Sequence, residues 1–395
     1  MKKNNKIDLV ILAGGEGKRI KKFLKGIPKP LYKFNQVPFL QLLLNYYAKY
    51  PFENIYIMCG YKADKIYKKF NNKNINFIKI KCFIEKKPLG TGGALRGLKK
   101  IIKNDFFLVN GDSFCDVKLN KFFFKPITSN TIFLTQNHSY KSNKKLSNLS
   151  INKKKNIYFR KKGNLMNAGI YLFKKRILNQ INLKTYSIED EIIPDLIKKR
   201  SLDGIYTSSL FMDIGTESNL HKAKKVLPAF FKKPAAFFDR DGVINYDTDY
   251  VYKIKDFKFK KNILTALKYL IKKNYYIFIV TNQAGVAKKK FSLNNFYKLH
   301  QYLKYYLNQK NINFDSVEYC PYHKNAILKK FKKNSIYRKP NNGMVKKIKR
   351  NWLLKDKKSF MIGDQISDKK CAKKSKLYFE FPKENILKQI KKLTQ

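Results

Sequence analysis

The sequence predicts an α/β protein of two domains, and three observations support this. Short apolar runs alternate with amphipathic stretches, which is the pattern of a mostly parallel sheet with helices on both faces. The pattern restarts near residue 234, after a basic stretch with two prolines at 222–234. The 395 residues also exceed what one ordinary hydrophobic core holds. We therefore expect one domain over residues 1–228 and another over 234–395.

The elements can be placed from these apolar runs. Strands are expected where a short apolar run ends in polar residues or glycine, and helices where apolar residues recur at helical spacing. The expected strands are Ile7–Leu12, Ile55–Cys59, Phe106–Val109, Ala235–Phe238, Tyr276–Val280 and Ser359–Ile362. The expected helices are Phe39–Tyr47 and Gly93–Ile102. Ligands of such sheets bind at the carboxyl ends of strands, so the chemistry is expected there.

The net charge is +59, from 86 Lys and Arg against 27 Asp and Glu. Such a charge suits a nucleic-acid or anionic-membrane partner. The basic residues are spread along the chain, however, and Lys, Asn, Ile, Phe and Tyr are all abundant, which favours the codon bias of an AT-rich genome as the cause. We therefore expect neither a nucleic-acid nor a membrane partner. A positive field would also attract phosphorylated small molecules.

Cysteine usage and the N-terminus indicate the compartment. The five cysteines are scattered and odd in number, which argues against a disulfide framework. The first apolar stretch is short and runs into Gly14, unlike a secretion signal. No apolar run approaches the ~20 residues of a membrane helix. We expect a cytoplasmic protein.

A glycine-rich turn, LAGGEGKRI, follows the first strand. Glycines let the backbone approach a triphosphate with its N–H groups pointing at the anion, and Arg19 can stabilise the charge on a leaving pyrophosphate. Because a glycine turn alone is more often structural, its context decides. That context is Lys29 between two prolines, followed by PLGTGGAL (88–95), NGDS (110–113), MNAGIYLF (166–173) and FMDIGT (211–216).

These motifs, in this order, resemble those of nucleoside-diphosphate-sugar pyrophosphorylases, and among them the guanylyltransferases that act on D-glycero-D-manno-heptose 1-phosphate. The resemblance covers the first domain and implies a Rossmann-like nucleotidyltransferase fold with a mixed sheet. In this family a sugar 1-phosphate attacks the α-phosphate of a nucleoside triphosphate. The residues implied for the nucleotide are Gly14, Gly15, Gly17 and Arg19 at the triphosphate, Lys29 at the transferred phosphate, and Gly90, Thr91 and Gly92 at the base and ribose.

The same resemblance implies a metal site and a sugar site. Asp112 and Asp213 would hold Mg²⁺ between them, and two carboxylates with room for water suit this hard cation. The residues implied for the sugar are Asn167, Gly169 and Glu189, with Lys162 at its phosphate. Many relatives carry Glu-Lys at the point where this chain has Lys161-Lys162.

The second domain opens with FFDRDGVIN (237–245), an apolar strand that ends in two aspartates. Asp239 and Asp241 can reach one site from alternate positions, one as a nucleophile and the other as an acid and base. A plain turn or a calcium loop shares this short pattern, but the ligands of a calcium loop follow a helix. The further segments that fit a phosphate site are Thr281 after a strand, Arg338-Lys339, and MIGDQISD (361–368) with Asp364 and Asp368.

This order of residues resembles the haloacid-dehalogenase superfamily, whose fold is also Rossmann-like. The stretches TNQAGVAKKKFS (281–292) and RKPNNGM (338–344) are similar to its heptose 1,7-bisphosphate 7-phosphatases. The resemblance implies that Asp239 attacks phosphorus, while Asp241 protonates the leaving oxygen and then activates water. The residues implied for Mg²⁺ are Asp239, the Asp241 carbonyl, Asp364 and Asp368. Those implied for the substrate are Thr281 and Lys339 at the phosphoryl oxygens, Arg338 at a second phosphate, and Asn282, Asp247 and Tyr250 around it.

One departure from these relatives concerns zinc. Relatives often carry a Cys-x-His pair and a Cys-x-Cys pair before Arg-Lys-Pro, because tetrahedral zinc needs four such ligands. Here Cys320 remains, Tyr322 stands at the histidine position with His323 beside it, and Ser335 and Tyr337 replace the later cysteines. Two ligands at best remain. We therefore predict no zinc and expect packing to hold this loop.

Together the two resemblances predict a bifunctional enzyme of GDP-heptose synthesis, with Mg²⁺ in both domains and only small-molecule substrates. The phosphatase would remove the 7-phosphate of D-glycero-D-manno-heptose 1,7-bisphosphate, and the nucleotidyltransferase would transfer GMP from GTP to the heptose 1-phosphate. The alternative is a mannose or glucose 1-phosphate nucleotidyltransferase fused to a histidinol-phosphate-like phosphatase. A remoter one is a basic nucleic-acid-binding protein on a degenerate scaffold, which would be expected to lose the carboxylates. The base, sugar, anomer and oligomeric state are left open.

Overall fold

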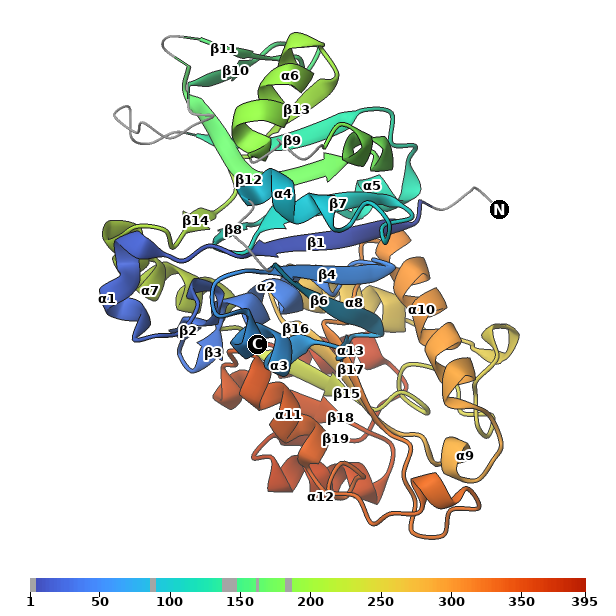
Figure 1. Ribbon diagram of the computed structural model, residues 1–395. Helices are drawn as coiled ribbons and strands as arrows, with labels where there is room; N and C mark the ends of the chain where they lie inside the picture. The colour runs from blue at the N-terminus through green and yellow to red at the C-terminus, as the bar shows by residue number, and fades with distance from the viewer. Residues whose placement is uncertain (1–4, 86–89, 137–147, 161–162, 182–186) are drawn as a thin grey trace.

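A computed structural model describes residues 5–85, 90–136, 148–160, 163–181 and 187–395. Each half of the chain forms a main sheet of its own (Figure 1). The first is a ten-stranded mixed sheet and the second a five-stranded parallel sheet. The predicted α/β class, with two domains and a mixed first sheet, is confirmed.

The first sheet is built around β1 (Ile7–Ala13), which is parallel to β4 (Asn54–Cys59) and to β7 (Asp105–Asn110). β12 (Leu165–Phe173) pairs antiparallel with β7 and makes the sheet mixed. The remaining strands of the sheet are β5 (Asn74–Ile75), β6 (Ile78–Ile84), β9 (Asn130–Gln136), β10 (Leu149–Ile151), β11 (Ile157–Phe159) and β13 (Leu202–Tyr206). Two short antiparallel pairs stand apart, β2 (Lys33–Phe34) with β3 (Val37–Pro38) and β8 (Ser113–Cys115) with β14 (Phe211–Asp213).

The helices of the first domain cover both faces of this sheet. They are α1 (Lys21–Leu24), α2 (Phe39–Tyr47), α3 (Ala63–Phe70), α4 (Gly90–Arg96), α5 (Asn120–Phe124), α6 (Ile193–Lys198) and α7 (Glu217–Phe231). Leu9 and Ile11 of β1 pack into the core that includes α2, whereas Val10 packs into the core that includes α4. Burial on both faces explains why this strand is apolar except at Asp8, whose buried carboxylate accepts from Asn54 at 2.9 Å and Asn104 at 3.2 Å.

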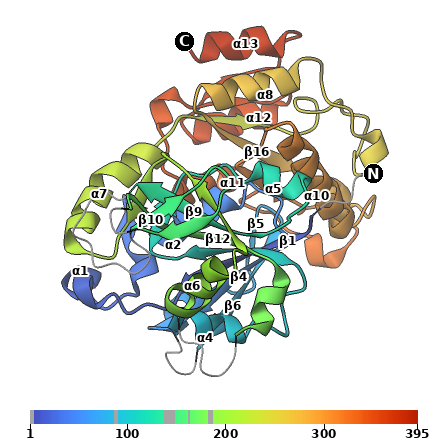
Figure 2. The ribbon, with the colours of Figure 1, turned by 90° about the horizontal axis from the view of Figure 1, so that it is seen from above.

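The second sheet has the strand order β17-β16-β15-β18-β19. Its strands are β15 (Ala235–Phe238), β16 (Tyr276–Asn282), β17 (Ser316–Cys320), β18 (Phe360–Ile362) and β19 (Tyr378–Glu380). Its helices are α8 (Ile263–Lys272), α9 (Ala284–Ala287), α10 (Leu293–Gln309), α11 (Gly343–Asn351), α12 (Ile366–Lys374) and α13 (Ile386–Leu393), and α8, α12 and α13 are seen from above in Figure 2. β15 lies in the middle, so its carboxyl end is central in the sheet.

Most predicted elements agree with the structure, and one is wrong. The helix expected at Gly93–Ile102 begins earlier, at Gly90, and ends at Arg96. Turns follow over 97–101, where the Leu98 N–H bonds the Leu95 carbonyl and the Ile101 N–H bonds the Leu98 carbonyl, each at 2.9 Å. The last helix of the first domain, α7, continues past residue 228 to Phe231 with Pro228 inside it. The exact domain limits of 1–228 and 234–395 stay a prediction. No helix in the described residues is long and apolar enough to cross a membrane.

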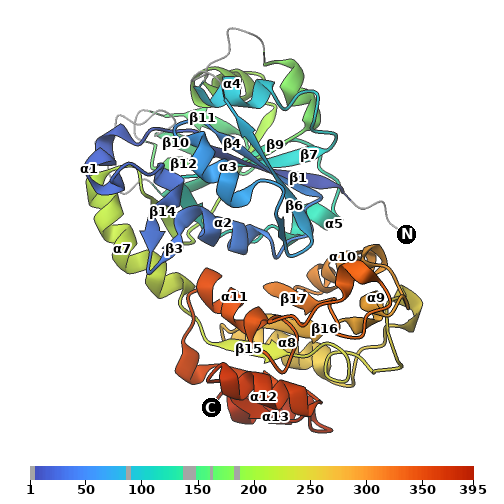
Figure 3. The ribbon, with the colours of Figure 1, turned by 60° about the horizontal axis from the view of Figure 1, so that its bottom comes forward.

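The two lobes lie side by side, joined through α7 (Figure 3). Side-chain amides bridge them: Asn45 donates to the Asn351 carbonyl at 2.7 Å, and Asn120 donates to the Asn308 side chain at 2.9 Å. Asp315 lies beside the same junction, where its carboxylate accepts the backbone N–H of Ile277 at 2.8 Å. Burial raises the pKa of Asp315 to about 6.

Replacing Asp315 with asparagine should therefore stabilise the fold at neutral pH. Below about pH 4 the carboxyl is protonated in both the folded and unfolded chains, and above pH 6 it is ionised in both, so the cost of burying the charge grows between these values. The amide keeps an oxygen for the Ile277 N–H. We expect a gain of about 1–3 kcal/mol at pH 7 and none near pH 4, measured by urea unfolding. The same change at the exposed Asp256 is the control; an equal gain at both pH values would contradict the assignment.

Candidate active sites

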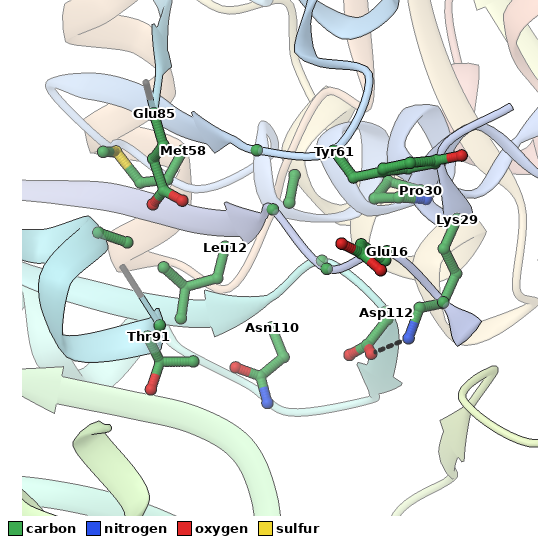
Figure 4. Close-up of a pocket in the computed structure, with 18 of the residues that line it drawn as sticks. Leu12, Glu16, Lys29, Pro30, Met58, Tyr61, Glu85, Thr91, Asn110 and Asp112 are labelled. Carbon is green, nitrogen blue, oxygen red and sulfur yellow. Dashed lines mark hydrogen bonds and ion pairs between the residues drawn. The ribbon is translucent and has the colours of Figure 1, made fainter. Parts of the chain in front are cut away.

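A pocket of about 670 Å³ opens at the carboxyl ends of β1, β4 and β7 (Figure 4). Both predicted glycine segments line it, through Gly14–Gly17 and Gly90–Thr91. Gly17 has φ +69°, and a Cβ there would lie 2.9 Å from Leu24 Cδ1, so the turn needs glycine at this point. The pocket is large enough for a nucleotide-sized ligand.

Four charged side chains gather beside this turn. Lys29 and Asp112 form an ion pair at 2.6 Å, with the lysine side chain 8% exposed and the aspartate 38% exposed. Asp213 lies next to Asp112 because β14 pairs with β8, and the backbone N–H of Ile214 donates to the Asp112 carbonyl at 2.9 Å. A Cβ on Gly215 would lie 3.3 Å from an Asp213 oxygen, 3.7 Å from Arg19 Nη2 and 3.9 Å from Lys29 Nζ. The structure thus brings these predicted residues together.

A second polar group borders the pocket at Thr91. Its hydroxyl donates to Glu189 at 2.7 Å, and Tyr171 donates to the other oxygen of Glu189 at 3.3 Å. Asn167 donates to the Tyr171 hydroxyl and accepts the Gly169 N–H at 2.8 Å. The residues predicted for the sugar and for the base are therefore one connected network. Its link, Tyr171, was not predicted, although it follows Gly169 by two positions in β12.

Glu85 is a further pocket residue that sequence reasoning missed. It follows the last residue of β6 and is half-buried, and burial raises its pKa to about 6. Its Oε1 has no hydrogen-bond partner among the described residues. Figure 4 shows its carboxylate facing the inside of the pocket. A free acceptor in this position can bind an N–H donor of a ligand.

The second site lies at the carboxyl end of β15. Lys339 Nζ contacts Asp239 at 2.7 Å and Asp368 at 2.6 Å, and its side chain is 1% exposed. One oxygen from each of Asp239, Asp364 and Asp368 lies within 4.8 Å of the others. Asp364 also lies close over Gly242, where a Cβ would be 2.4 Å from its Oδ2. Three converging carboxylates form an oxygen donor set that fits a hard divalent cation.

The charges of this site compensate each other. Burial raises the pKa of Asp239 to about 7, and the ammonium of Lys339 opposes this rise. Burial alone would lower the pKa of Lys339, but Asp239 and Asp368 together raise it above its usual value. Lys339 is therefore a fixed cation beside the carboxylate that is predicted to attack phosphorus. Asp239 also accepts the backbone N–H of Arg240 at 2.7 Å.

Asp241 is held by three neighbouring side chains. Arg240 donates to both its oxygens, with the shortest contacts at 2.8 Å, and Asn245 and Gln283 each donate at 3.0 Å. Burial would raise the pKa of Asp241, but Arg240 and these hydrogen bonds bring it below its usual value. Gln283 also donates to Thr281 Oγ1 at 3.0 Å, which ties the predicted phosphate ligand to the same network.

The remaining predicted substrate residues lie around this centre. Both ends of the Asn282 amide bond the backbone of Lys339, at 3.0 and 3.1 Å, so Asn282 positions the lysine. Tyr250 accepts from Lys288 at 3.1 Å, and Asp247 is exposed. Arg338 is half-buried, and its Nη1 has no partner among the described residues. Direct contacts of these residues with a substrate stay a prediction.

Comparison with known proteins identifies the first half. The family described as "Nucleotidyl transferase" matches residues 9–229. The D-glycero-alpha-D-manno-heptose 1-phosphate guanylyltransferase of Campylobacter jejuni is 32% identical over 216 residues, which cover 54% of this chain and 96% of that protein. The chain belongs to the nucleotidyl transferase family.

The second half matches phosphatases. The family described as "Polynucleotide kinase 3 phosphatase" matches residues 234–386 of this nucleotidyl transferase family member. The D-glycero-beta-D-manno-heptose-1,7-bisphosphate 7-phosphatase of Rhodopseudomonas palustris is 38% identical, covering 36% of this chain and 79% of that protein. The D-glycero-alpha-D-manno-heptose-1,7-bisphosphate 7-phosphatase of Campylobacter jejuni is 39% identical, covering 35% and 74%. The predicted fusion of a nucleotidyltransferase with a phosphatase of the haloacid-dehalogenase type is confirmed, and both families typically use divalent metal ions.

Two predictions remain open in this nucleotidyltransferase–phosphatase. The first is the contact of Lys162 with the sugar phosphate, because Lys162 lies outside the described residues. The second concerns the loop predicted to lack zinc, where His323 Nδ1 accepts the N–H of Asn325 at 3.0 Å, and the backbone N–H of His323 donates to the Phe331 carbonyl at 3.1 Å. Ser335 is buried and caps the Tyr337 N–H at 3.2 Å. Backbone and side-chain hydrogen bonds thus connect this loop, and the absence of zinc stays a prediction.

Proposed function

We propose that this protein performs two consecutive steps of GDP-heptose synthesis. It would dephosphorylate D-glycero-D-manno-heptose 1,7-bisphosphate at C7 and then transfer GMP from GTP to the heptose 1-phosphate, releasing pyrophosphate. The observation that carries the proposal is the fusion itself, because one chain joins relatives of two enzymes. Removing the 7-phosphate from the bisphosphate named for the phosphatase leaves the heptose 1-phosphate named for the guanylyltransferase. The Campylobacter jejuni pair share the alpha anomer, which we favour here.

In the phosphatase, Asp239 Oδ would attack phosphorus while the bond from phosphorus to the C7 oxygen breaks. Asp241 would give its proton to that leaving oxygen, since an arriving phosphate dianion raises the pKa of a nearby carboxyl. In the second step Asp241 would take a proton from water, whose oxygen displaces Asp239 from phosphorus and releases orthophosphate. Lys339 and Thr281 would hold the phosphoryl oxygens. A Mg²⁺ ion bound by Asp239, the Asp241 carbonyl, Asp364 and Asp368 would neutralise charge.

In the nucleotidyltransferase, the backbone of Gly14–Gly17 and the side chain of Arg19 would bind the triphosphate. Lys29 would stabilise the charge on the α-phosphate as the sugar phosphate oxygen attacks and pyrophosphate leaves. Asp112 and Asp213 would hold a Mg²⁺ ion, which neutralises phosphate charge. Asn167, Gly169 and Glu189 would orient the sugar, with Lys162 at its phosphate, and Gly90, Thr91 and Gly92 would line the base and ribose.

We further propose that the protein acts in the cytoplasm on small molecules, without a nucleic-acid or membrane partner. All five cysteines are free and buried, which suits a reducing compartment. Four of its acidic site residues, Asp112, Asp239, Asp364 and Asp368, border or fill the two sites, and carboxylates repel a phosphate backbone.

A coupled assay tests the proposal. The protein would receive Mg²⁺, GTP and the heptose bisphosphate, and mass spectrometry would follow orthophosphate, pyrophosphate and nucleotide sugar, with ATP, CTP, UTP and dTTP in parallel. We expect orthophosphate first and GDP-heptose second, and chelation by EDTA should stop both until Mg²⁺ is restored. Orthophosphate without nucleotide sugar would redirect the first domain to other sugar 1-phosphates. Neither product from a folded protein would refute the heptose assignment.

A further inference from the structure

A hairpin of the nucleotidyltransferase domain reaches into the phosphatase domain. It joins β5 to β6 at the edge of the first sheet, and its turn residues Asn76 and Phe77 have φ +45° and +66°. This left-handed backbone is unusual for residues other than glycine, and most so for a bulky one. Asn76 is fixed from both domains: its side chain donates to the carbonyls of Ala48 and Phe314, each at 3.1 Å, and its carbonyl accepts from Lys304 at 3.0 Å. The turn is therefore a defined contact between the two domains.

Phe77 enters a group of aromatic rings that otherwise belongs to the phosphatase. Its ring centroid lies 4.9 Å from His300, 5.5 Å from Tyr297, 5.8 Å from Phe296 and 6.2 Å from Tyr319. We call these five residues the aromatic box. Phe77 comes from the first domain and packs against two hydrophobic clusters of the second. The nucleotidyltransferase thus supplies one wall of the box.

The aromatic box contacts Arg240, the residue that holds Asp241. Phe296 packs 4.1 Å from His300, and the Arg240 guanidinium lies 5.6 Å from the Phe296 ring centroid. Arg240 is 2% exposed and donates hydrogen bonds to both oxygens of Asp241. A cation against an aromatic face is more strongly bound when it is removed from water, so the position of Phe296 bears on the position of Arg240.

The groups that face Arg240 leave few other restraints. Its Nη2 also donates to the Val251 carbonyl at 2.8 Å, while its Nη1 has no partner among the described residues. His300 Nδ1–H donates to the Phe296 carbonyl at 3.0 Å. Burial together with Arg240 lowers the pKa of His300 to about 3, so it stays neutral beside the guanidinium. The Phe296 ring is therefore a further contact of the Arg240 guanidinium besides its hydrogen bonds to Asp241 and Val251.

We propose that Phe77 is a positioning residue for the phosphatase reaction, acting through Phe296 and Arg240 on the Asp241 carboxylate. The inference rests on the proposed role of Asp241 as the acid that protonates the leaving sugar oxygen. Fusion of the two domains would then matter for catalysis, since a residue of the nucleotidyltransferase helps to position Asp241 of the phosphatase. The same strand, β6, is followed by Glu85 in the nucleotide pocket.

The leaving group distinguishes this role from a merely structural one. A sugar phosphate has a strongly basic leaving oxygen that needs a proton from Asp241. The leaving group of 4-nitrophenyl phosphate is a stable phenolate, which needs no proton to leave. Phe77→Ala should lower kcat for the sugar bisphosphate about tenfold with KM nearly unchanged, because misplacing a catalytic group by a fraction of an ångström has this effect. The first-step burst of 4-nitrophenolate, measured before the Asp241-assisted hydrolysis of the aspartyl phosphate limits turnover, should stay within about twofold of wild type, as should the rate of nucleotidyl transfer.

Conservative and control variants complete the test. Phe77→Tyr keeps the ring and should retain most of the wild-type activity. Phe77→Leu keeps the bulk without a ring, and its kcat should lie between those of wild type and Phe77→Ala. It also serves as the test if Phe77→Ala does not fold. Tyr67→Ala, which removes an exposed ring from the same domain, should change nothing. Equal losses in the first-step rates of both phosphate esters, or no loss at all in a folded Phe77→Ala protein, would overturn the inference. Wild-type hydrolysis that Asp239→Asn abolishes establishes the proposed function independently. If the wild type prefers another alkyl phosphate, the comparison uses that ester.

Discussion

Replacing Asp239 with asparagine should abolish orthophosphate release from every phosphate ester while nucleotidyl transfer continues at the wild-type rate. Asparagine has nearly the same shape, but its amide cannot attack phosphorus. Removing a nucleophile on which the whole reaction depends lowers kcat at least about a thousandfold. The loss should be the same for 4-nitrophenyl phosphate, because both esters need the nucleophile whether or not their leaving group needs a proton. Steady-state assays of both activities on one preparation measure this.

The variant should also remain folded. Burial raises the pKa of Asp239 to about 7, so the ionised carboxylate is costly where it lies and is tolerated because Lys339 is 2.7 Å away. Lys339 keeps its contact with Asp368 in the variant, and thermal unfolding should therefore change little. Asp256→Asn, the same change at an exposed position of the domain, is the matched control. Residual hydrolysis above a few per cent would assign the nucleophile to another residue.

The parts of this protein that follow from sequence are those whose cause is local. Ala235–Phe238 is a strand in the structure as predicted, because a short strand that is buried on both faces is mostly apolar. The Asp239 and Asp241 pair is visible because both lie at the end of that one strand. The helix predicted at Gly93–Ile102 was misplaced because its limits depend on how a glycine-rich segment packs, which apolar spacing does not record.

The residues that were missed owe their importance to partners distant in the sequence. Tyr171 reads as an ordinary strand residue until its hydroxyl is found between Asn167 and Glu189. Glu85 reads as a polar residue after a strand until its carboxylate is seen in the pocket (Figure 4). Phe77 has no sequence signal at all, since the box it enters is formed by a domain that follows much later in the chain. Such contacts are set by tertiary packing, on which local patterns carry no information.

Replacing Lys29 with methionine should have the largest effect on the other reaction, lowering kcat for nucleotidyl transfer about 100- to 1000-fold and leaving phosphate release unchanged. Methionine fills a similar space without the charge. Lys29 lies on the short turn Lys29–Leu31, with a proline before and after it, so its ammonium is held in place before any substrate arrives. A cation fixed in this way stabilises charge on the α-phosphate without the reorganisation that a mobile lysine would require.

The ion pair at 2.6 Å makes a second consequence of this change measurable. Lys29 neutralises Asp112, so in Lys29→Met the two carboxylates Asp112 and Asp213 face each other with one cation fewer, and the half-saturating concentration of the divalent metal should fall even as kcat falls. Lys33→Met, which removes an exposed lysine four positions away, should alter neither quantity. Metal titrations of initial rate at saturating nucleotide separate the two effects. Removing a cation from beside two carboxylates must strengthen their binding of metal. A lower kcat together with a higher half-saturating metal concentration would therefore mean that Lys29 supports the fold of the turn and does not act on phosphate.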